Sequence, residues 1–432
     1  MCYKIFFIIV IMLNGLFAQS FFNKVIGDEI GFQSARSFAI GQTHFMNSNT
    51  SALALRNPAQ LAFIKDRVKI DFNLAGLMVN ERRAIDLKDY FGDFLVEGDY
   101  VSNNIFNNYN QIGFVTSFEL FFMNFGAAIS HGPWSSLDYR YEEEVRGSES
   151  FDDGIIGIRD PIIGYHILEH QGTIDLTSFG LAFGVNERIS IGASFNQFHK
   201  GSHSYEMKVT QISESNENLS SVEDVKESIN FREDNFLSLS AILKLNKTDF
   251  SVGYEGNAFI QSDDSFQNNI SSELGLPIYI DDSNISLLKY SAKGISIEKP
   301  EKIKMGINHH IGSNKNYRLF AFEVIQNKFS TNIYYNDYMK INLGIEYINR
   351  DKVFRLGLSY KTPSFEVLSP LTTFSFGTSK IYNSLIFDVS ASYSYQNYHY
   401  SDLFSVDGDV RPDYDNVHES VWSLVSTISY SF

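Results

Sequence analysis

The sequence closes on VWSLVSTISYSF (residues 421–432), and this stretch decides the fold. One face carries Trp422, Leu424, Ile428, Tyr430 and Phe432, and the other carries Ser423, Val425, Thr427, Ser429 and Ser431. A period of two is the pattern of a β-strand whose two faces meet different surroundings. Such a strand suits lipid on one side and the interior of a barrel on the other. A strand of a soluble β-sandwich is the alternative, because period two alone fits both.

The same alternation recurs through the second half of the chain, for example across residues 341–347, 354–360 and 385–395. Segments of strand length give about 14 spans, an even number of the kind found in single-chain barrels. We therefore predict an all-β protein, with a transmembrane antiparallel β-barrel over residues 66–432. The predicted spans are 66–79, 109–118, 120–130, 173–185, 188–199, 235–245, 249–260, 301–311, 317–329, 339–348, 353–361, 371–380, 385–397 and 420–432.

The predicted connections alternate between tight and long, which is typical of barrels with short periplasmic turns and longer extracellular loops. Tight links rich in turn-forming residues lie at 186–187, 246–247, 312–316, 349–351 and around Asn383. Long polar links span 80–108, 131–172, 200–234, 261–300 and 398–419, with shorter ones at 330–338 and 362–370. The first long link has apolar residues at helical spacing, which predicts an external amphipathic helix that roofs the barrel, with a landing site for apolar ligands as the alternative. These residues are Ala84, Ile85, Leu87, Tyr90, Phe91, Phe94 and Leu95.

The first residues predict an export signal over 1–18. Lys4 provides a basic start, an apolar run follows as far as Phe17, and Ala18 supplies a small residue for cleavage. The apolar run is shorter than the roughly 20 residues that a membrane-spanning helix needs. The only cysteine, Cys2, lies within this signal. Disulfides, thiol catalysis and thiolate metal sites are therefore excluded from the mature chain.

The chain is acidic, with 51 Asp and Glu residues against 35 Lys and Arg residues. It has no basic cluster of the kind that phosphate binding needs, which argues against nucleic acid as a partner. No Gly-x-Ser-x-Gly elbow is present, so we predict no enzyme, no catalytic residue and no cofactor.

Metal binding is not predicted either. His309 and His310 are the only adjacent histidines, and in a strand they point to opposite faces. Acidic residues crowd one external stretch, which we interpret as a solvated loop, with calcium binding as the alternative. They are Asp407, Asp409, Asp413 and Asp415.

A compact segment over 19–65 precedes the predicted wall. Its stretch 50–56 favours a short helix with Asn49 or Thr50 as the N-cap. Pro58 ends this helix, because proline biases the residue before it away from helical angles. A helix and turn ahead of a closed barrel has one obvious location, the lumen, since a wide barrel without a plug leaks water. We therefore predict a hatch inside the barrel.

Small residues at 39–41, followed by a helix and then Asn57-Pro58-Ala59 and Leu61, resemble the N-terminal hatch of the FadL-like outer-membrane transporters. The resemblance also covers the signal, the number of strands and the aromatic terminus. It implies a barrel of the bacterial outer membrane that carries apolar small molecules, either fatty-acid-like or aromatic. The gate would then be Asn57, Pro58, Ala59 and Leu61.

Two alternatives remain for the hatch pattern. It also resembles the PorV-like barrels of type IX secretion, which implies binding of secreted protein through the extracellular loops. In the other alternative, Asn57 and Pro58 cap a helix and the segment only plugs the pore.

Two further sets of residues are candidates for function. Gly132 and Pro133 directly follow a predicted strand, and proline cannot donate to a strand ladder, so they mark a candidate break in the wall. A loop that begins outside the membrane is the alternative. Trp422, Tyr430 and Phe432 resemble the aromatic signal by which the barrel-assembly machinery inserts such proteins among the lipids of the outer membrane.

Overall fold

The structure is a computed structural model of the chain. It describes residues 28–121, 123–146, 162–212, 225–261, 273–281, 284–291, 296–313, 316–330, 336–350, 352–365, 368–401 and 414–432. The predicted export signal at 1–18 lies outside the described residues, as do Asp407, Asp409 and Asp413 of the acidic stretch.

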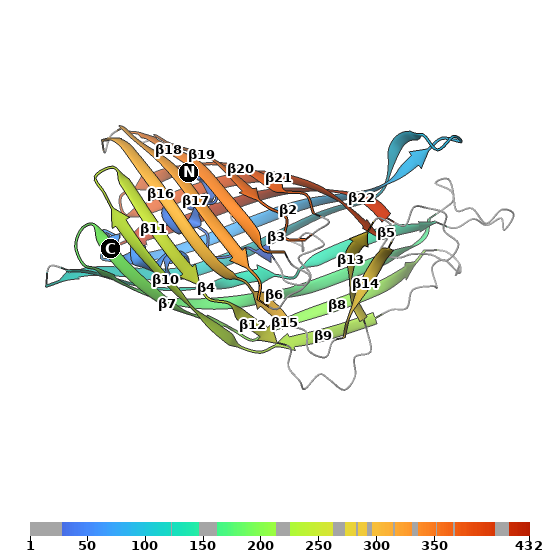
Figure 1. The fold of residues 1–432 in the computed structure, drawn as a ribbon, viewed down its shortest axis with the longest axis horizontal. Coiled ribbons are helices and arrows are strands. Elements are labelled where there is room, and N and C mark those ends of the chain that lie inside the picture. Colours follow the sequence, from blue (N-terminus) through green and yellow to red (C-terminus); the bar gives the residue numbers. More distant parts are fainter. Residues whose placement is uncertain are drawn as a thin grey trace.

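Fourteen antiparallel strands close into a barrel (Figure 1), which confirms the predicted fold class and strand number. The C-terminal strand closes the ring, because β22 pairs with β2 from Lys69↔Ser431 to Ala84↔Asn416. The wall strands are β2 Val68–Lys88, β3 Phe94–Leu120, β4 Met123–Ser136, β6 Ile162–Gly184, β7 Ile189–Phe198, β10 Asp234–Lys244, β11 Thr248–Glu255, β16 Glu301–Ser313, β17 Asn316–Lys328, β18 Tyr338–Asn349, β19 Lys352–Lys361, β20 Leu371–Tyr382, β21 Leu385–Ser401 and β22 Tyr414–Ser431.

Short turns join the strands at one end of the barrel, at the left of Figure 1, and long connections join them at the other. Three of the long links that the sequence predicts as loops contain additional strands, and the other two, 80–108 and 398–419, contain the ends of wall strands, so those predictions are wrong in part. Some of the strands in these links pair with wall strands and so lengthen the wall. Strand β6, for example, also pairs with β5 and β8. The added strands are β5 Tyr139–Arg146, β8 Gly201–Gln211, β9 Val225–Phe231, β12 Ala258–Gln261, β13 Glu273–Asp281, β14 Asn284–Ser291 and β15 Ser296–Lys299.

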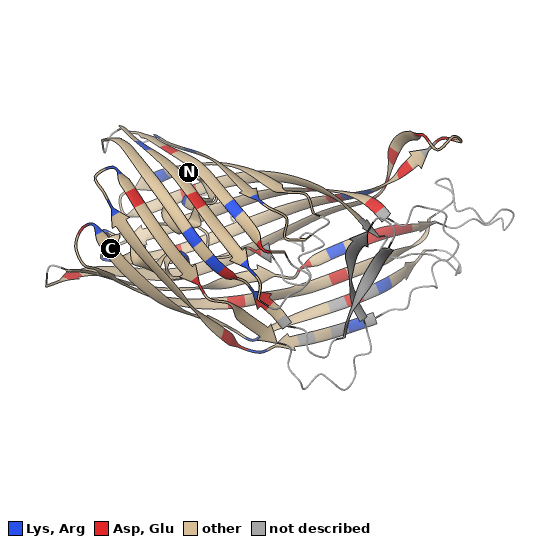
Figure 2. Cartoon of the chain, viewed as in Figure 1, with Lys and Arg blue, Asp and Glu red and all other residues tan. Residues whose placement is uncertain are grey.

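The outer face of the wall is apolar and the inner face is small or polar. On β10, for example, Leu237 and Leu239 are 59% and 52% exposed, whereas Ser238 and Ser240 face inward and are buried. A ring of exposed apolar side chains is stable only if lipid covers it, so this pattern indicates a membrane-spanning barrel. Charged residues are frequent on the strands that extend toward the long connections (Figure 2). Among the described residues, no helix has the length and apolarity to cross a membrane.

The predicted external helix within residues 80–108 is wrong. Strand β2 runs on to Lys88 and β3 begins at Phe94, and the two form a hairpin that projects from the barrel instead of roofing it (Figure 1). Asp89 closes its turn by accepting the backbone N–H groups of Phe91 and Asp93 at 2.9 Å. Cross-strand pairing therefore overrides the helical spacing of the apolar residues.

The hatch lies inside the barrel near the short turns and consists of short helices. They are α3 Ala35–Ala39, α4 His44–Asn47, α5 Leu53–Arg56 and the 3-10 helix η1 Pro58–Phe63. A fragment of strand, β1 Asp28–Glu29, precedes them. The predicted end of the helix before Pro58 is confirmed. The predicted N-cap is wrong: Ala52 occupies that position without a side-chain cap, and Thr50 contributes only its backbone oxygen, to the N–H of Leu53.

Candidate functional site

Wall glycines hold the hatch at close range. On nine strands, a Cβ built on an inward glycine would come closer than 3.0 Å to a hatch atom. We call this set the glycine belt. It comprises Gly113, Gly126, Gly180, Gly192, Gly253, Gly306, Gly344, Gly357 and Gly377. Because the wall has no side chain at these positions, the hatch packs directly against the wall backbone and forms a closely packed floor across the lumen.

Adding one methyl group to the belt is expected to loosen the hatch. A Cβ on Gly357 would lie 1.8 Å from the backbone nitrogen of Gly41, so Gly357→Ala forces the hatch to move. Overpacking of this kind costs about 1–3 kcal/mol. Hydrogen exchange of the amides of α3 should therefore accelerate. Gly256→Ala is the control, since its nearest neighbour would be 3.4 Å away. Equal exchange in both variants would contradict the role of the belt.

Inward carboxylates of the wall bind the backbone of the hatch. Asp71 of β2 accepts the N–H of Ser51 at 2.7 Å, and Glu323 of β17 accepts the N–H groups of Phe45 and Met46 at 3.1 and 3.2 Å. All of these groups are buried. Sequence analysis missed both carboxylates, although a charged residue at an inward position of an amphipathic strand is a readable signal.

A chain of buried ion pairs joins the hatch to three wall strands. Arg36 of α3 donates to both carboxylate oxygens of Glu346 on β18, at 3.0 and 2.7 Å. Glu346 also accepts from Arg355 of β19 at 2.7 Å, and Arg355 donates to Asp388 of β21 at 2.6 Å. The two arginines and two carboxylates balance one another, so the hatch is tied to the wall without an unpaired charge in this group.

The predicted gate residues lie at the contact between hatch and wall. The Asn57 side-chain amide donates to the backbone oxygen of Phe45 at 2.9 Å and to Ser251 of β11 at 3.1 Å. Ala59 donates its N–H to Ser240 at 2.8 Å. Pro58 and Leu61 are buried in the same contact. The Asn57 side chain does not cap η1, so its hydrogen bonds anchor the hatch to the wall. A gating role for the four residues remains a prediction.

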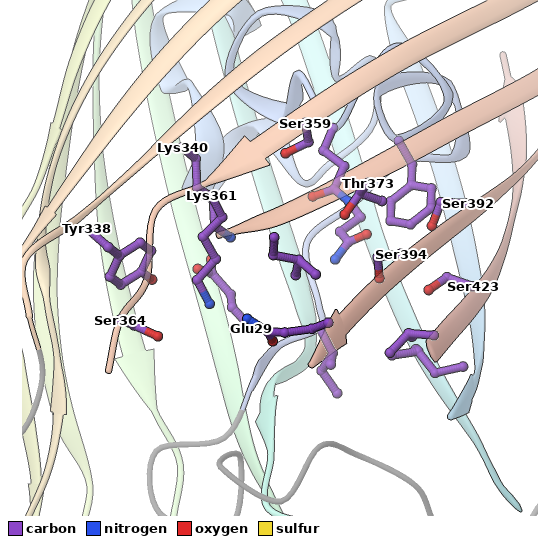
Figure 3. Close-up of a pocket in the computed structure, with 18 of the residues that line it drawn as sticks. Glu29, Tyr338, Lys340, Ser359, Lys361, Ser364, Thr373, Ser392, Ser394 and Ser423 are labelled. Atoms are coloured by element: carbon purple, nitrogen blue, oxygen red, sulfur yellow. The ribbon is translucent and has the colours of Figure 1, made fainter. Parts of the chain in front are cut away.

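A cavity of about 230 Å³ lies above the hatch, meaning on the side of the long connections, which is below the hatch helices in the view of Figure 3. Part of its lining is apolar, and part consists of hydroxyl groups and charged groups. The apolar part includes Phe38, Phe329, Phe365, Leu368, Leu371, Val421 and Val425. The polar part includes Glu29, Lys302, Lys340, Lys361, Ser359, Thr373, Ser392, Ser394 and Ser423. The arrangement suits a molecule with an apolar body and a polar end.

The hatch carries one histidine, the half-buried His44, which contacts the Ser37 hydroxyl at 2.9 Å. Burial, together with the positive charges of Arg56 and Lys340, holds the pKa of the His44 imidazole well below its usual value. A histidine of this kind is neutral in the folded hatch, whereas in an unfolded hatch it would bind a proton below about pH 6.5.

Acidification is therefore expected to destabilise the hatch through His44. Stability is lost as the pH falls below the value of the unfolded histidine, at about 1.4 kcal/mol per pH unit. Hydrogen exchange of the hatch amides, compared between wild type and His44→Gln from pH 7 to 5, isolates this contribution from those of other groups. The opening free energy of the wild-type hatch should fall relative to that of the variant as the pH is lowered, and a difference that stays constant with pH would contradict the assignment.

The backbone pairing of strands β3 and β4 ends next to the residues that the sequence suggests as a break. Their pairing ends at Ile112↔His131, and the register of β4 against β6 shifts between Pro133 and Ser135. Beyond this point β4 pairs with β1 of the N-terminal segment instead of β3. The predicted loop beginning at 131 is wrong, because β4 continues to Ser136. Pro133 lines a space of about 10 Å³ beyond the last β3–β4 pair, which we call the side gap, and an interruption of the wall at Gly132 and Pro133 remains a prediction.

Polar side chains and the N-terminal segment bridge the side gap. Asn107 and Tyr109 of β3 each donate to Asp138, beyond the end of β4, at 3.4 Å. Ile30 donates its N–H to the backbone oxygen of Trp134 at 3.0 Å. Since the two strands share no backbone ladder here, less free energy opposes their separation than elsewhere in the wall.

The remaining sequence candidates lie away from the cavity. Trp422, Tyr430 and Phe432 lie on the outer face of the barrel, exposed by 45%, 45% and 69%. The N–H of Phe432 bonds to Val68, so the terminal residue completes the closing strand pair. His310 contacts Asp249 at 2.9 Å, and the part of the chain that is described contains no cluster of three or more metal-ligating side chains.

Comparison with known proteins identifies the fold. No family model matches the sequence, and no curated protein matches it either. A FadL homologue of Pseudomonas aeruginosa has a similar structure, with a TM-score of 0.57 and 11% identity over 94% of this chain and 100% of the other. The toluene transporter TodX of P. putida gives a TM-score of 0.52 and 14% identity over 93% and 98%. The CymD monoaromatic hydrocarbon channel gives 0.50 and 14% over 96% and 99%. The chain therefore has the fold of the FadL-like outer-membrane channels.

Proposed function

We propose that the protein carries hydrophobic compounds through the bacterial outer membrane. The observation that carries the proposal is the cavity above the hatch, inside a barrel whose outer face is apolar. Apolar compounds need a protein route, since a watery pore does not solvate them. The structures of similar fold include a toluene transporter and a monoaromatic hydrocarbon channel, which supports transport and a role without catalysis.

The proposed route runs from the outside into the cavity and then sideways through the gap between β3 and β4. Two features favour this route over a path through the floor. The hatch is held by the glycine belt and by inward carboxylates, whereas the gap is bridged mainly by side chains. The gap must widen before a ligand leaves, because its resting space accommodates little more than a water molecule.

Compounds that stay with the purified protein test the proposal. The protein is purified in an uncharged detergent, and bound small molecules are extracted and identified by mass spectrometry. We expect an apolar or amphipathic compound in amounts comparable to the protein. The control for membrane lipid carried over in the preparation is a second sample, in which the barrel is unfolded and washed before its small molecules are extracted. Equal amounts of compound in both preparations would count against a ligand cavity.

One observation favours a second function, the docking of a secreted protein. The tip of the β2–β3 hairpin exposes Tyr90 and Phe91 by 98% and 86% and projects beyond the barrel (Figure 1). Exposed apolar groups on an ordered turn mark interaction sites. If the function is docking, Tyr90→Ser with Phe91→Ser will release a secreted protein that co-purifies in stoichiometric amount with the wild type. No such protein is expected if transport is the function.

A further inference from the structure

The end of the barrel with the short turns carries a surplus of exposed cations. Lys and Arg lie on several of these turns, at the left of Figure 2. Together with the cations on the adjoining strand ends, they form a set that we call the basic rim. All of its members are exposed: Lys65, Arg67, Arg188, Lys247, Arg318, Arg350, Lys352 and Lys380.

Few negative charges oppose the basic rim. Among the described residues, the acidic side chains that reach solvent at this end are the exposed Glu119 and Glu187 and the half-buried Asp66 and Asp249. Asp249 faces the lumen, where it contacts His310. None of the cations of the basic rim forms an ion pair within the described part of the chain. This end therefore has positive charge in excess, although the whole chain has a formal net charge of −16.

Two members of the basic rim lie on the outer face of the wall, each beside an aromatic ring. Arg318 of β17 shares its face with the exposed Phe320 and pairs with Tyr347 of β18, whose ring centre is 5.7 Å from the guanidinium carbon. The ammonium nitrogen of Lys380 on β20 lies 5.7 Å from the ring centre of Tyr382. Aromatic rings favour the level of the lipid head groups, and long cationic side chains extend their charge to the same level. Both cations therefore stand where the apolar outer face ends.

We propose that the basic rim binds the head groups of anionic phospholipids, with Arg318 and Lys380 as its contacts on the outer face. A lipid phosphate beside a guanidinium or an ammonium group supplies the negative charge that the described side chains of this end lack. Lipid is favoured over a soluble acidic partner because both cations lie on the face that lipid covers. The proposal concerns the outside of the wall, so it does not depend on the transport function.

The test measures which lipid the folded barrel prefers as its neighbour. The protein is reconstituted into vesicles of dioleoyl phosphatidylcholine, and a small fraction of spin-labelled phosphatidylglycerol or spin-labelled phosphatidylcholine is added. The electron paramagnetic resonance spectrum gives the share of each labelled lipid that the protein immobilises. The ratio of the two shares is the selectivity for the anionic lipid. Both ends of the barrel meet the same lipids in these vesicles.

Two double variants separate the position of the charge from its amount. Arg318→Gln with Lys380→Gln removes two charges of the basic rim and leaves both aromatic rings in place. Lys200→Gln with Lys328→Gln is the matched control, because it removes two cations at the end with the long connections. Lys328 lies opposite Glu301 in the β16–β17 ladder, so a carboxylate already accompanies it. The two variants have the same net charge, and circular dichroism establishes that both fold.

We expect the wild type to select phosphatidylglycerol over phosphatidylcholine. A cation beside an anionic lipid surface contributes about fivefold to local binding. Because the spectrum averages over every lipid position around the barrel, the selectivity should fall about twofold or more in the variant of Arg318 and Lys380. The control variant should match the wild type. High salt should lower the selectivity of the wild type, since salt screens exposed charges.

Two results would overturn the proposal. In one, the wild type immobilises both labelled lipids equally. In the other, the two double variants lose the same selectivity, which would assign it to net charge and not to the basic rim. If the wild type shows no lipid preference but retains soluble polyglutamate, the basic rim serves an acidic soluble partner and the proposal is likewise wrong.

Discussion

Cross-linking the side gap is expected to reduce uptake of hydrophobic compounds to the level of cells without the protein. The cross-link joins Asn107→Cys on β3 to Asp138→Cys beyond β4, whose native side chains lie 3.4 Å apart across the gap. A short bifunctional thiol reagent bridges the pair, and a reductant releases it. The predicted mature chain has no other cysteine, because Cys2 lies in the export signal, so the reagent has no competing target. Uptake should return on reduction.

The matched control places the cross-link where the same two strands are already paired. Thr116 and Ala127 are direct partners in the β3–β4 ladder, and both lie below the gap. Bridging Thr116→Cys to Ala127→Cys adds a covalent bond without closing a route, so uptake should be unchanged. Loss of uptake in both pairs would point to a general effect of the reagent. Full uptake with the gap bridged would contradict the sideways route.

Removing the charge of Glu346 is expected to release α3 of the hatch. Glu346→Gln leaves Arg36 without its charge partner and Arg355 with only one, and the carboxylate that joins them is 1% exposed. Breaking a buried ion pair by removing one partner costs about 3–5 kcal/mol. Hydrogen exchange of the α3 amides should accelerate accordingly, while exchange in β20 and β21 should not change.

An exposed ion pair supplies the control for Glu346. Arg82 and Asp99 on the projecting hairpin form a contact of 2.8 Å with side chains about half exposed. Asp99→Asn should cost about 1 kcal/mol or less, because solvent screens the pair. A similar response of the hatch to both substitutions would mean that the pair of Arg36 and Glu346 does not hold it in place.

The wall of the barrel could be predicted from the sequence because it depends on local alternation. Each predicted span overlaps a wall strand, although the closing strand begins at Tyr414, before its predicted start at residue 420. The length of β2 and β3 could not be predicted in this way. Tyr90 and Phe91 lie in a turn between paired strands. The apolar residues on the two sides of this turn are spaced as they would be in a helix, so the spacing alone does not distinguish a helix from a hairpin.

The cavity was harder to predict than the hatch. The hatch could be predicted because its sequence contains a local motif, Asn57-Pro58-Ala59. The lining of the cavity comes from the hatch and many strands, so residues such as Lys340 and Lys361 meet only after the barrel has closed. The sequence did contain a signal for the contacts that hold the hatch: Asp71 and Glu346 interrupt strands at inward positions, where a charge needs a partner.

The central claim, transport of hydrophobic compounds, is tested most directly by uptake into whole cells. Bacteria that lack their own hydrophobic-compound channels are given the gene or an empty vector. The initial rate of uptake is then measured with a radiolabelled decyl compound and a radiolabelled monoaromatic hydrocarbon. The account predicts faster uptake of at least one of them in cells that carry the folded barrel. Equal rates in both strains for both compounds, with the barrel present in the outer membrane, would contradict it.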